Sequence, residues 1–135
     1  MKRPASEEGR RWLEQAEEDL STARYLLQGG KFYMVCFLSQ QIAEKALKGY
    51  LYSQGEELVV GHSVEELCEW AAEFAPDFKA LKEEISILDS YYIPTRYPNG
   101  LPASIPARVF NKKTAEETLQ LAQKTLELAK RKVTR

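Results

Sequence analysis

Two short segments and one isolated histidine hold the side chains that could do chemistry. The first segment is QQIAEKALK at residues 40–48, where Gln41, Glu44 and Lys48 share one polar strip if the segment is helical. In that position Lys48 could be offered to a phosphate group. Glu44 and Lys48 also have the (i, i+4) spacing of an ordinary salt bridge on a helix surface, which stabilises a helix only slightly.

The second segment is DSYYIPTRYPN at residues 89–99, which combines two charges with three tyrosines where a helix meets a loop. Arg96 offers a planar guanidinium that can bind phosphate through two hydrogen bonds. Tyr92 and Tyr97 offer aromatic faces on which a base could stack. Alternatively, Arg96 pairs with Asp89 and fixes the loop, while the tyrosines pack against the protein.

His62 is the single histidine of the chain, and it comes just before a serine that can cap a helix. Such a histidine can help to close a turn, or it can titrate near neutral pH within a site. The basic end of the chain, residues 130–135, fits either a solvated helix end that complements the helix dipole or a patch that contacts nucleic acid.

Several classes of function are disfavoured by what the 135 residues lack. Cys36 and Cys68 together with one histidine cannot form the usual zinc cages, and each cysteine falls in an apolar pattern typical of a buried residue. We expect no disulfide, metal site or cofactor. There is no glycine-rich phosphate loop, no hydrolase nucleophile elbow, no membrane-length apolar run and no apolar stretch of a signal peptide near the N-terminus. We therefore expect a cytoplasmic protein that does not enter a membrane.

Helical periodicity dominates the chain and positions these segments. Apolar residues at steps of three and four predict helices at about 6–28, 31–54, 64–75, 78–92 and 112–133. Gly29 and Gly30 should end the first helix, and Ser63 and Asn111 should cap the third and last. Four prolines in residues 94–110 predict a long ordered loop without helix or central strand. The sequence thus predicts a single all-α domain over residues 1–135, an up-and-down bundle of four to five antiparallel helices with a long Pro-rich loop before the last helix.

The net charge of −1 hides two opposed regions. Residues 1–93 contain 10 basic and 17 acidic side chains, whereas residues 94–135 contain 9 basic and 3 acidic ones. This split of −7 against +6 fits dimerisation by charge complementarity, or a basic face for an anionic ligand. It also fits a last helix that simply packs against acidic helices of the same bundle.

These segments, in their order along the chain, resemble the HEPN family of small helical domains. The resemblance covers about residues 8–133 and rests on a Trp12-x3-Ala16-x2-Asp19-Leu20 pattern, the 40–48 run, Gly61-His62-Ser63 and the Thr95-Arg96-Tyr97-Pro98 segment. It implies a bundle of four or five helices that is commonly a homodimer. It also implies pairing with a minimal nucleotidyltransferase, as a toxin, an antitoxin or a substrate-binding subunit.

Many members of that family are metal-independent ribonucleases with an Arg-x4-6-His motif, and here the sequence departs from the pattern. No histidine follows Arg96, and the positions separated from His62 by four to six intervening residues are Glu57, Glu56 and Gly55, none of which is an arginine. The nuclease motif is absent, so no catalytic residue is assigned. For Arg96, the resemblance implies a contact with phosphate rather than a catalytic role.

The leading hypothesis is a binding module for a nucleotide or RNA that acts beside a minimal nucleotidyltransferase. Its predicted groove is lined by Glu44, Lys48, His62, Asp89, Tyr92, Arg96 and Tyr97. In it, Lys48 and Arg96 contact phosphate, Tyr92 or Tyr97 stacks on a base, and Glu44 and Asp89 orient the cations or accept from base or ribose. One rival is a ribonuclease or toxin in which His62 replaces the missing histidine. The other is a pure dimerisation or interaction domain.

Overall fold

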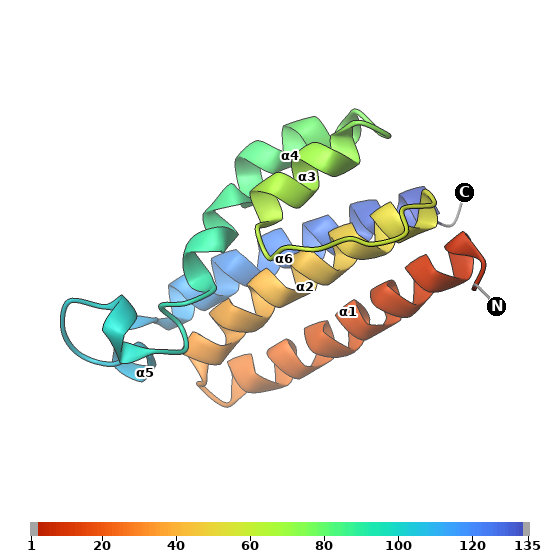
Figure 1. Cartoon of the computed structure of the whole chain (residues 1–135). Coiled ribbons are helices and arrows are strands. Elements are labelled where there is room, and N and C mark those ends of the chain that lie inside the picture. Colours follow the sequence, from red (N-terminus) through yellow and green to blue (C-terminus); the bar gives the residue numbers. More distant parts are fainter. Residues whose placement is uncertain (1–2, 134–135) are drawn as a thin grey trace.

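Three long helices form the body of the molecule. The structure, a computed structural model, describes residues 3–133 and contains only helices and connecting segments over that range. The long helices are α1 (Ala5–Gln28), α2 (Phe32–Ser53) and α6 (Lys112–Val133), and the start of α1 lies at the same end of the bundle as the end of α6 (Figure 1). The predicted all-α bundle is confirmed. Thr134 and Arg135 of the predicted basic end lie outside the described residues.

Helix α2 is the central helix and packs against α1, α3 (Val64–Ala72) and α6. It is apolar on several sides, as a helix with several neighbours must be, and its buried residues extend over most of its length. The glycine turn predicted after α1 is present, with Gly30 in the left-handed region at φ 76°. This turn sends α2 back alongside α1 in the opposite direction (Figure 1).

Helices α1 and α2 approach each other closely at two glycines. A Cβ atom on Gly9 would lie 2.6 Å from the carbonyl oxygen of Gly49, and a Cβ on Gly49 would lie 2.9 Å from the carbonyl oxygen of Gly9. Both partners are backbone atoms, so neither can move aside cheaply. This contact fixes the spacing of the two helices next to Lys48.

Residues 54–63, here called the strap, connect α2 to α3 (Val64–Ala72) by an extended path. The strap runs back along α2, so α3 begins beside the middle of α2 rather than at its end (Figure 1). Consecutive helices were expected to alternate in direction, but the returning strap lets α2 and α6 run the same way. Helix α4 (Asp77–Ile85) then folds back against α3.

The fourth predicted helix, 78–92, is α-helical only as far as Ile85. It continues as a 3-10 helix, η1 (Ser86–Tyr91). The helix begins at Asp77, directly after Pro76.

The Pro-rich segment contains the short 3-10 helix η2 (Pro98–Gly100) and one α-helical turn, α5 (Pro106–Val109). The expectation of no helix there was therefore wrong, because proline is well tolerated at the first position of a helix. The predicted caps Asn111 and Ser63 are both present: Asn111 Oδ1 accepts from the Thr114 amide at 2.9 Å, and Ser63 Oγ from the Glu66 amide at 3.1 Å.

Candidate functional site

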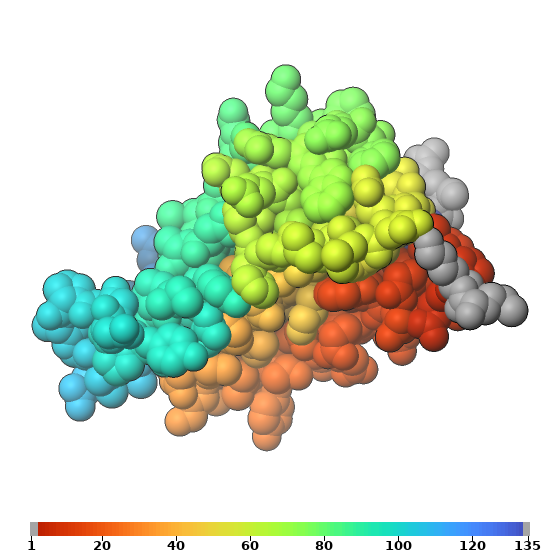
Figure 2. Space-filling model, viewed as in Figure 1, coloured from red at the N-terminus to blue at the C-terminus, as the bar shows by residue number. Residues whose placement is uncertain are grey.

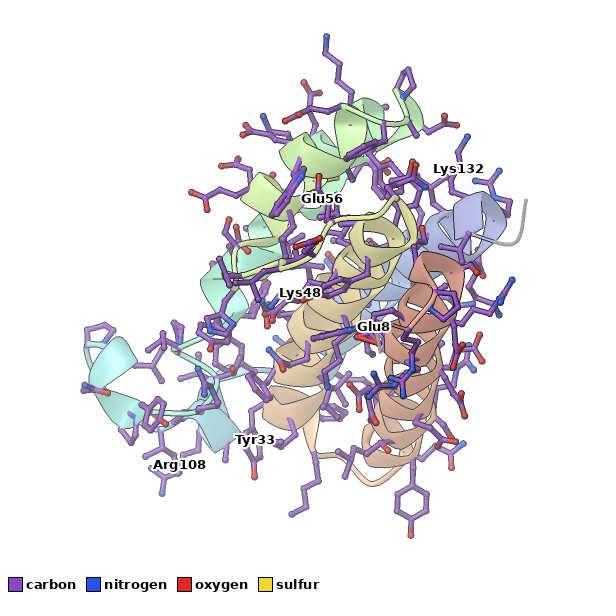
Figure 3. The ribbon with its side chains drawn as sticks, turned by 45° about the vertical axis from the view of Figure 1, so that its right-hand side comes forward. Glu8, Tyr33, Lys48, Glu56, Arg108 and Lys132 are labelled. Carbon is purple, nitrogen blue, oxygen red and sulfur yellow. The ribbon has the colours of Figure 1, made fainter. Side chains whose placement is uncertain are left out.

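The strap is held against α2 at two points, and the second point places His62. At the first, the amide of Val59 donates to the Tyr52 hydroxyl at 3.1 Å. At the second, the side-chain amide of the fully buried Gln40 donates to the backbone carbonyl of His62 at 2.8 Å. The strap therefore covers part of α2, and Figure 3 shows Lys48 on α2 between the strap and α1.

Glu44 is the centre of a buried polar network under the strap. Its Oε2 accepts from Lys48 Nζ at 3.1 Å, and its two oxygens lie 3.2 and 3.3 Å from His62 Nδ1. The side-chain amides of Gln40 and Gln41 donate to its Oε1 at 3.2 and 3.4 Å. The Glu44 and Lys48 side chains are only 7% and 8% exposed. The pair is therefore not a solvated salt bridge on the surface, and Lys48 is not accessible to a phosphate group.

The network orients the His62 ring. A carboxylate accepts but cannot donate, so the neutral imidazole places its proton on Nδ1, toward Glu44. The side chain of His62 is 58% exposed, and within residues 3–133 its Nε2 has no hydrogen-bond partner. His62 therefore presents a free ring nitrogen to the surface while Glu44 holds the other.

Aromatic rings and Arg96 continue the site on the surface. The rings of His62 and Tyr92 stack at 4.8 Å with an interplanar angle of 19°. The guanidinium carbon of Arg96 lies 4.4 Å from the Tyr92 ring centre and 5.2 Å from that of the half-exposed Tyr97. Arg96 Nε donates to the Tyr92 carbonyl at 2.7 Å, and the other guanidinium nitrogens have no hydrogen-bond partner among the described residues.

Phe37 also belongs to this cluster, although it is not among the site residues predicted from the sequence. Its ring centre is 4.7 Å from the Arg96 guanidinium carbon and 6.4 Å from the Tyr92 ring centre. An aromatic residue off the main apolar face of α2 was the available signal. Thr95 was also missed as a support. It is fully buried, and its hydroxyl donates to the Tyr91 carbonyl at 2.5 Å, which holds the turn that presents Arg96.

Asp89 has a different task from the one expected. Its carboxylate accepts from Ser63 Oγ at 2.8 Å and from the amides of Val64 and Glu65 at 2.6 and 3.2 Å. Asp89 and Arg96 form no ion pair within the described part of the chain. Asp89 thus anchors the start of α3, directly after His62, and so fixes the end of the strap.

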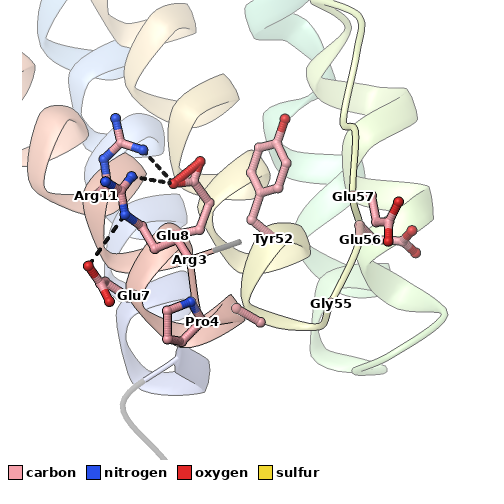
Figure 4. A pocket seen from close by; sticks show the side chains of 10 residues that line it. Arg3, Pro4, Glu7, Glu8, Arg11, Tyr52, Gly55, Glu56 and Glu57 are labelled. Carbon is pink, nitrogen blue, oxygen red and sulfur yellow. Dashed lines mark hydrogen bonds and ion pairs between the residues drawn. The ribbon is translucent and has the colours of Figure 1, made fainter. Parts of the chain in front are cut away.

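A cavity of about 680 Å³ lies away from this cluster, between the start of α1 and the turn after α2. Its lining includes two arginines, Arg3 just before α1 and Arg11 on α1, but Figure 4 shows both paired with glutamates of α1. Arg11 Nη1 lies 2.5 Å from Glu8 Oε1, and Arg3 Nε lies 3.3 Å from Glu7 Oε1. Because glutamates neutralise the charges of both arginines, neither is available to bind a phosphate in this cavity.

Other chemistry has little support in the described residues. Residues 3–133 contain no group of three or more His, Cys, Asp or Glu side chains that could hold a metal ion. Cys36 and Cys68 are buried free thiols, and burial raises the pKa of Cys68 to about 12. Among the same residues, no helix is both long and apolar enough to span a membrane.

Similar proteins are found by family, sequence and structure. The family model described as the HEPN domain matches residues 10–132. "Putative toxin MJ1304" of Methanocaldococcus jannaschii is 30% identical over 127 residues, which cover 88% of this chain and 84% of that protein. The crystal structure of TT1696 from Thermus thermophilus matches with a TM-score of 0.82 and 42% identity, over 92% of this chain and 97% of the other. That of ST0689, an archaeal HEPN homologue, matches with a TM-score of 0.77 and 34% identity, over 98% and 99%.

Proposed function

The chain belongs to the HEPN family, and from this membership we propose that it is a binding module for a nucleotide or a segment of RNA. The binding surface is the cluster of His62, Tyr92, Arg96 and Tyr97. One observation carries the proposal: Arg96 is held against aromatic rings while most of its donors have no protein partner in the described residues. A guanidinium in that state can bind a phosphate while the half-exposed Tyr97 stacks on a base.

In this proposal the buried residues of the predicted groove position the exposed residues and do not touch the ligand themselves. Lys48 pairs with Glu44 under the strap, so in this proposal it offsets the charge of Glu44 rather than touching phosphate. Glu44 holds His62, and Asp89 holds the start of α3. The ligand surface is therefore smaller than the seven residues selected from the sequence.

Binding is tested with a fluorescent single-stranded 12-mer of uridine and, separately, with ATP as probes. We expect Arg96→Ala to weaken at least one probe about tenfold or more, because a charge-assisted hydrogen-bond pair to phosphate is lost. Tyr97→Ala should weaken the RNA probe about fivefold or more, as expected for one stacked base. Arg24→Ala and Tyr25→Ala remove exposed side chains of the same types from α1 and serve as matched controls. Equal losses in variants and controls would reject this site.

We also propose that the chain acts within a two-protein unit and as a homodimer. The family resemblance supports a minimal nucleotidyltransferase as partner, and the M. jannaschii relative is named as a candidate toxin. The test is co-expression with the product of the neighbouring reading frame, followed by purification through a tag on this chain alone. A stoichiometric nucleotidyltransferase would support the unit, whereas a neighbour of another class, or one that does not co-purify, would contradict it.

A second candidate function is metal-independent RNA cleavage, favoured by the Glu44–His62 contact. His62 Nε2 could take the proton of a ribose 2′-hydroxyl, whose oxygen then bonds to the adjacent phosphorus as the bond to the 5′-oxygen breaks. The imidazolium returns the proton to the leaving oxygen, and Arg96 stabilises the charge on the phosphate. The products would be a 2′,3′-cyclic phosphate and a 5′-hydroxyl end. Cleavage in EDTA that is lost in His62→Ala would support this candidate, and unchanged cleavage would remove His62 from it.

A further inference from the structure

The basic residues of the C-terminal third fall into two groups with different surroundings. On α6, Lys124, Lys130 and Lys132 pair with Glu84, Glu17 and Asp77 of the same bundle, at 2.7, 2.6 and 3.0 Å. By contrast, Arg108, Lys112 and Lys113 are exposed and have no carboxylate within ion-pair distance among the described residues. These three belong to residues 93–113, here called the knob, and no acidic residue occurs from 90 to 115. The knob therefore keeps an unneutralised positive charge.

The knob also exposes aliphatic side chains. Ile93, Ile105 and Val109 are 46%, 38% and 44% exposed. Ile105 immediately precedes α5 and Val109 ends it, and the amide of Val109 donates to the carbonyl of Ile105 at 3.2 Å, so the two side chains lie one helical turn apart. Figure 2 shows the knob, in cyan, projecting from one end of the molecule, and Figure 3 places Arg108 there, beyond the start of α2. A surface that mixes aliphatic and basic side chains is suited to a protein partner, because nucleic acid gives exposed aliphatic groups little to bind.

The knob is held in shape before any partner binds. A Cβ atom on Gly100 would lie 3.0 Å from the Cα of Pro94, so two parts of the knob are in close contact. Pro106 is buried, and Phe110 packs edge-on against Tyr91 at 5.9 Å. A preorganised surface loses little conformational entropy on docking.

A complementary surface lies on the strap and the outer side of α3. Residues 54–73 contain six acidic residues and no lysine or arginine. Glu65, Glu66 and Glu73 are exposed and pair with no cation within residues 3–133. On the strap that leads into α3, Leu58 and Val60 are 71% and 65% exposed. We call these five residues the acidic face.

We infer that the knob of one copy of this chain docks on the acidic face of a second copy. Each chain holds both halves of the contact, opposite in charge and each with exposed aliphatic side chains. A two-fold pair would form the contact twice, with the knob of each copy on the acidic face of the other. The inference rests on the homodimer proposed above and does not depend on nucleotide binding.

The test is sedimentation velocity of the whole chain, without nucleotide, over a range of concentrations at low and moderate salt. The knob variant is Arg108→Glu with Lys113→Glu, and the acidic-face variant is Glu66→Lys with Glu73→Lys. We expect the wild type to be a dimer in the micromolar range, with a dissociation constant that rises with salt. Each variant alone should raise that constant tenfold or more, because like charges then face each other.

An equimolar mixture of the two variants is the decisive measurement. In a mixed pair every knob again meets a face of opposite charge, so dimers should return to near wild-type affinity. This recovery also shows that both variants are folded. Matched controls reverse exposed charges on α1 by the same amount and should leave the dimer unchanged: Arg10→Glu with Arg24→Glu, and Glu14→Lys with Glu18→Lys.

Three results would overturn the inference. The first is a wild type that stays monomeric at hundreds of micromolar. The second is a charge reversal that raises the dimer dissociation constant no more than its α1 control does. The third is an equimolar mixture of the two variants that does not regain dimers. If the knob variant kept its dimer but lost the uridine 12-mer far beyond its control, the knob would be a nucleic-acid surface instead. Loss of nucleotide binding in Arg96→Ala with an intact dimer would leave the docking inference standing and count only against the binding site.

Discussion

Glu44→Gln tests whether water is excluded from the network of Glu44, Lys48 and His62 under the strap, as the burial of Glu44 and Lys48 indicates. The substitution keeps the shape of the side chain and removes its charge, which leaves the ammonium of Lys48, 8% exposed, without a counter-charge. Removing one member of a buried pair typically costs about 3–5 kcal/mol. We expect a value near the lower end, about 3 kcal/mol, because the glutamine oxygen can still accept one hydrogen bond.

The companion variants complete a double-mutant cycle. Lys48→Met should also destabilise the protein, since it leaves the Glu44 carboxylate with only His62 and two amides. The double variant should recover much of the loss, because replacing both charges can be nearly neutral. We therefore expect a coupling energy of about 2 kcal/mol or more. The measurement is urea unfolding followed by circular dichroism, with an unchanged dependence of the unfolding free energy on urea concentration as the check on two-state behaviour.

The exposed pair of Lys124 and Glu84 is the matched control. Its side chains are 56% and 45% exposed at a similar distance, 2.7 Å, so its coupling should stay below about 1 kcal/mol. A Glu44–Lys48 coupling as small as this control would mean that water screens the pair. The inferred support of His62 by a buried carboxylate would then be refuted.

Three further outcomes follow from packing and charge. Gly49→Ala should lower the unfolding free energy by about 1–3 kcal/mol in a urea titration, because its Cβ would press on α1, whereas Gly29→Ala, with no such contact, should change it little. Cys68 should resist alkylation at pH 8 until the protein unfolds, since burial raises its thiol pKa to about 12. The hydrogen bond from Lys132 lowers the pKa of Asp77, so Lys132→Met should raise that pKa in an NMR titration, and the small stability from this pair should fade as pH drops through the Asp77 pKa.

The fold was largely predictable because its determinants are local. The glycine after α1 and the caps at Ser63 and Asn111 act within one turn of a helix, and all three stand where expected. The end of the fourth helix was not predictable in the same way. Leu81, Ile85 and Leu88 are spaced by four and three residues, which fits either an α-helix or a 3-10 helix.

The site was harder to predict because its decisive contacts are distant in the sequence. Glu44 and Lys48 appear from spacing alone as a surface pair, and their burial comes from a strap that returns along α2 and is held by Gln40. Asp89 looks like a partner for Arg96, seven residues away, yet it bonds the start of α3, 24 to 26 residues earlier. Only the tertiary path of the strap decides between these alternatives, and residue types do not encode it.

The charge of the two parts of the chain is likewise ambiguous from the sequence, and the ion pairs in the structure resolve that ambiguity. A split of −7 against +6 cannot say whether the basic region serves the bundle or a partner. The ion pairs separate the two uses. Lys124, Lys130 and Lys132, in the later turns of α6, pair with acids of their own chain, as the simpler interpretation expected, while the knob residues Arg108, Lys112 and Lys113 have no ion-pair partner among the described residues. Because paired surface charges contribute little further attraction, the knob rather than these three paired lysines should determine how association depends on salt. Charge reversal at Lys124, Lys130 and Lys132 should therefore change stability more than self-association, and reversal on the knob should do the opposite.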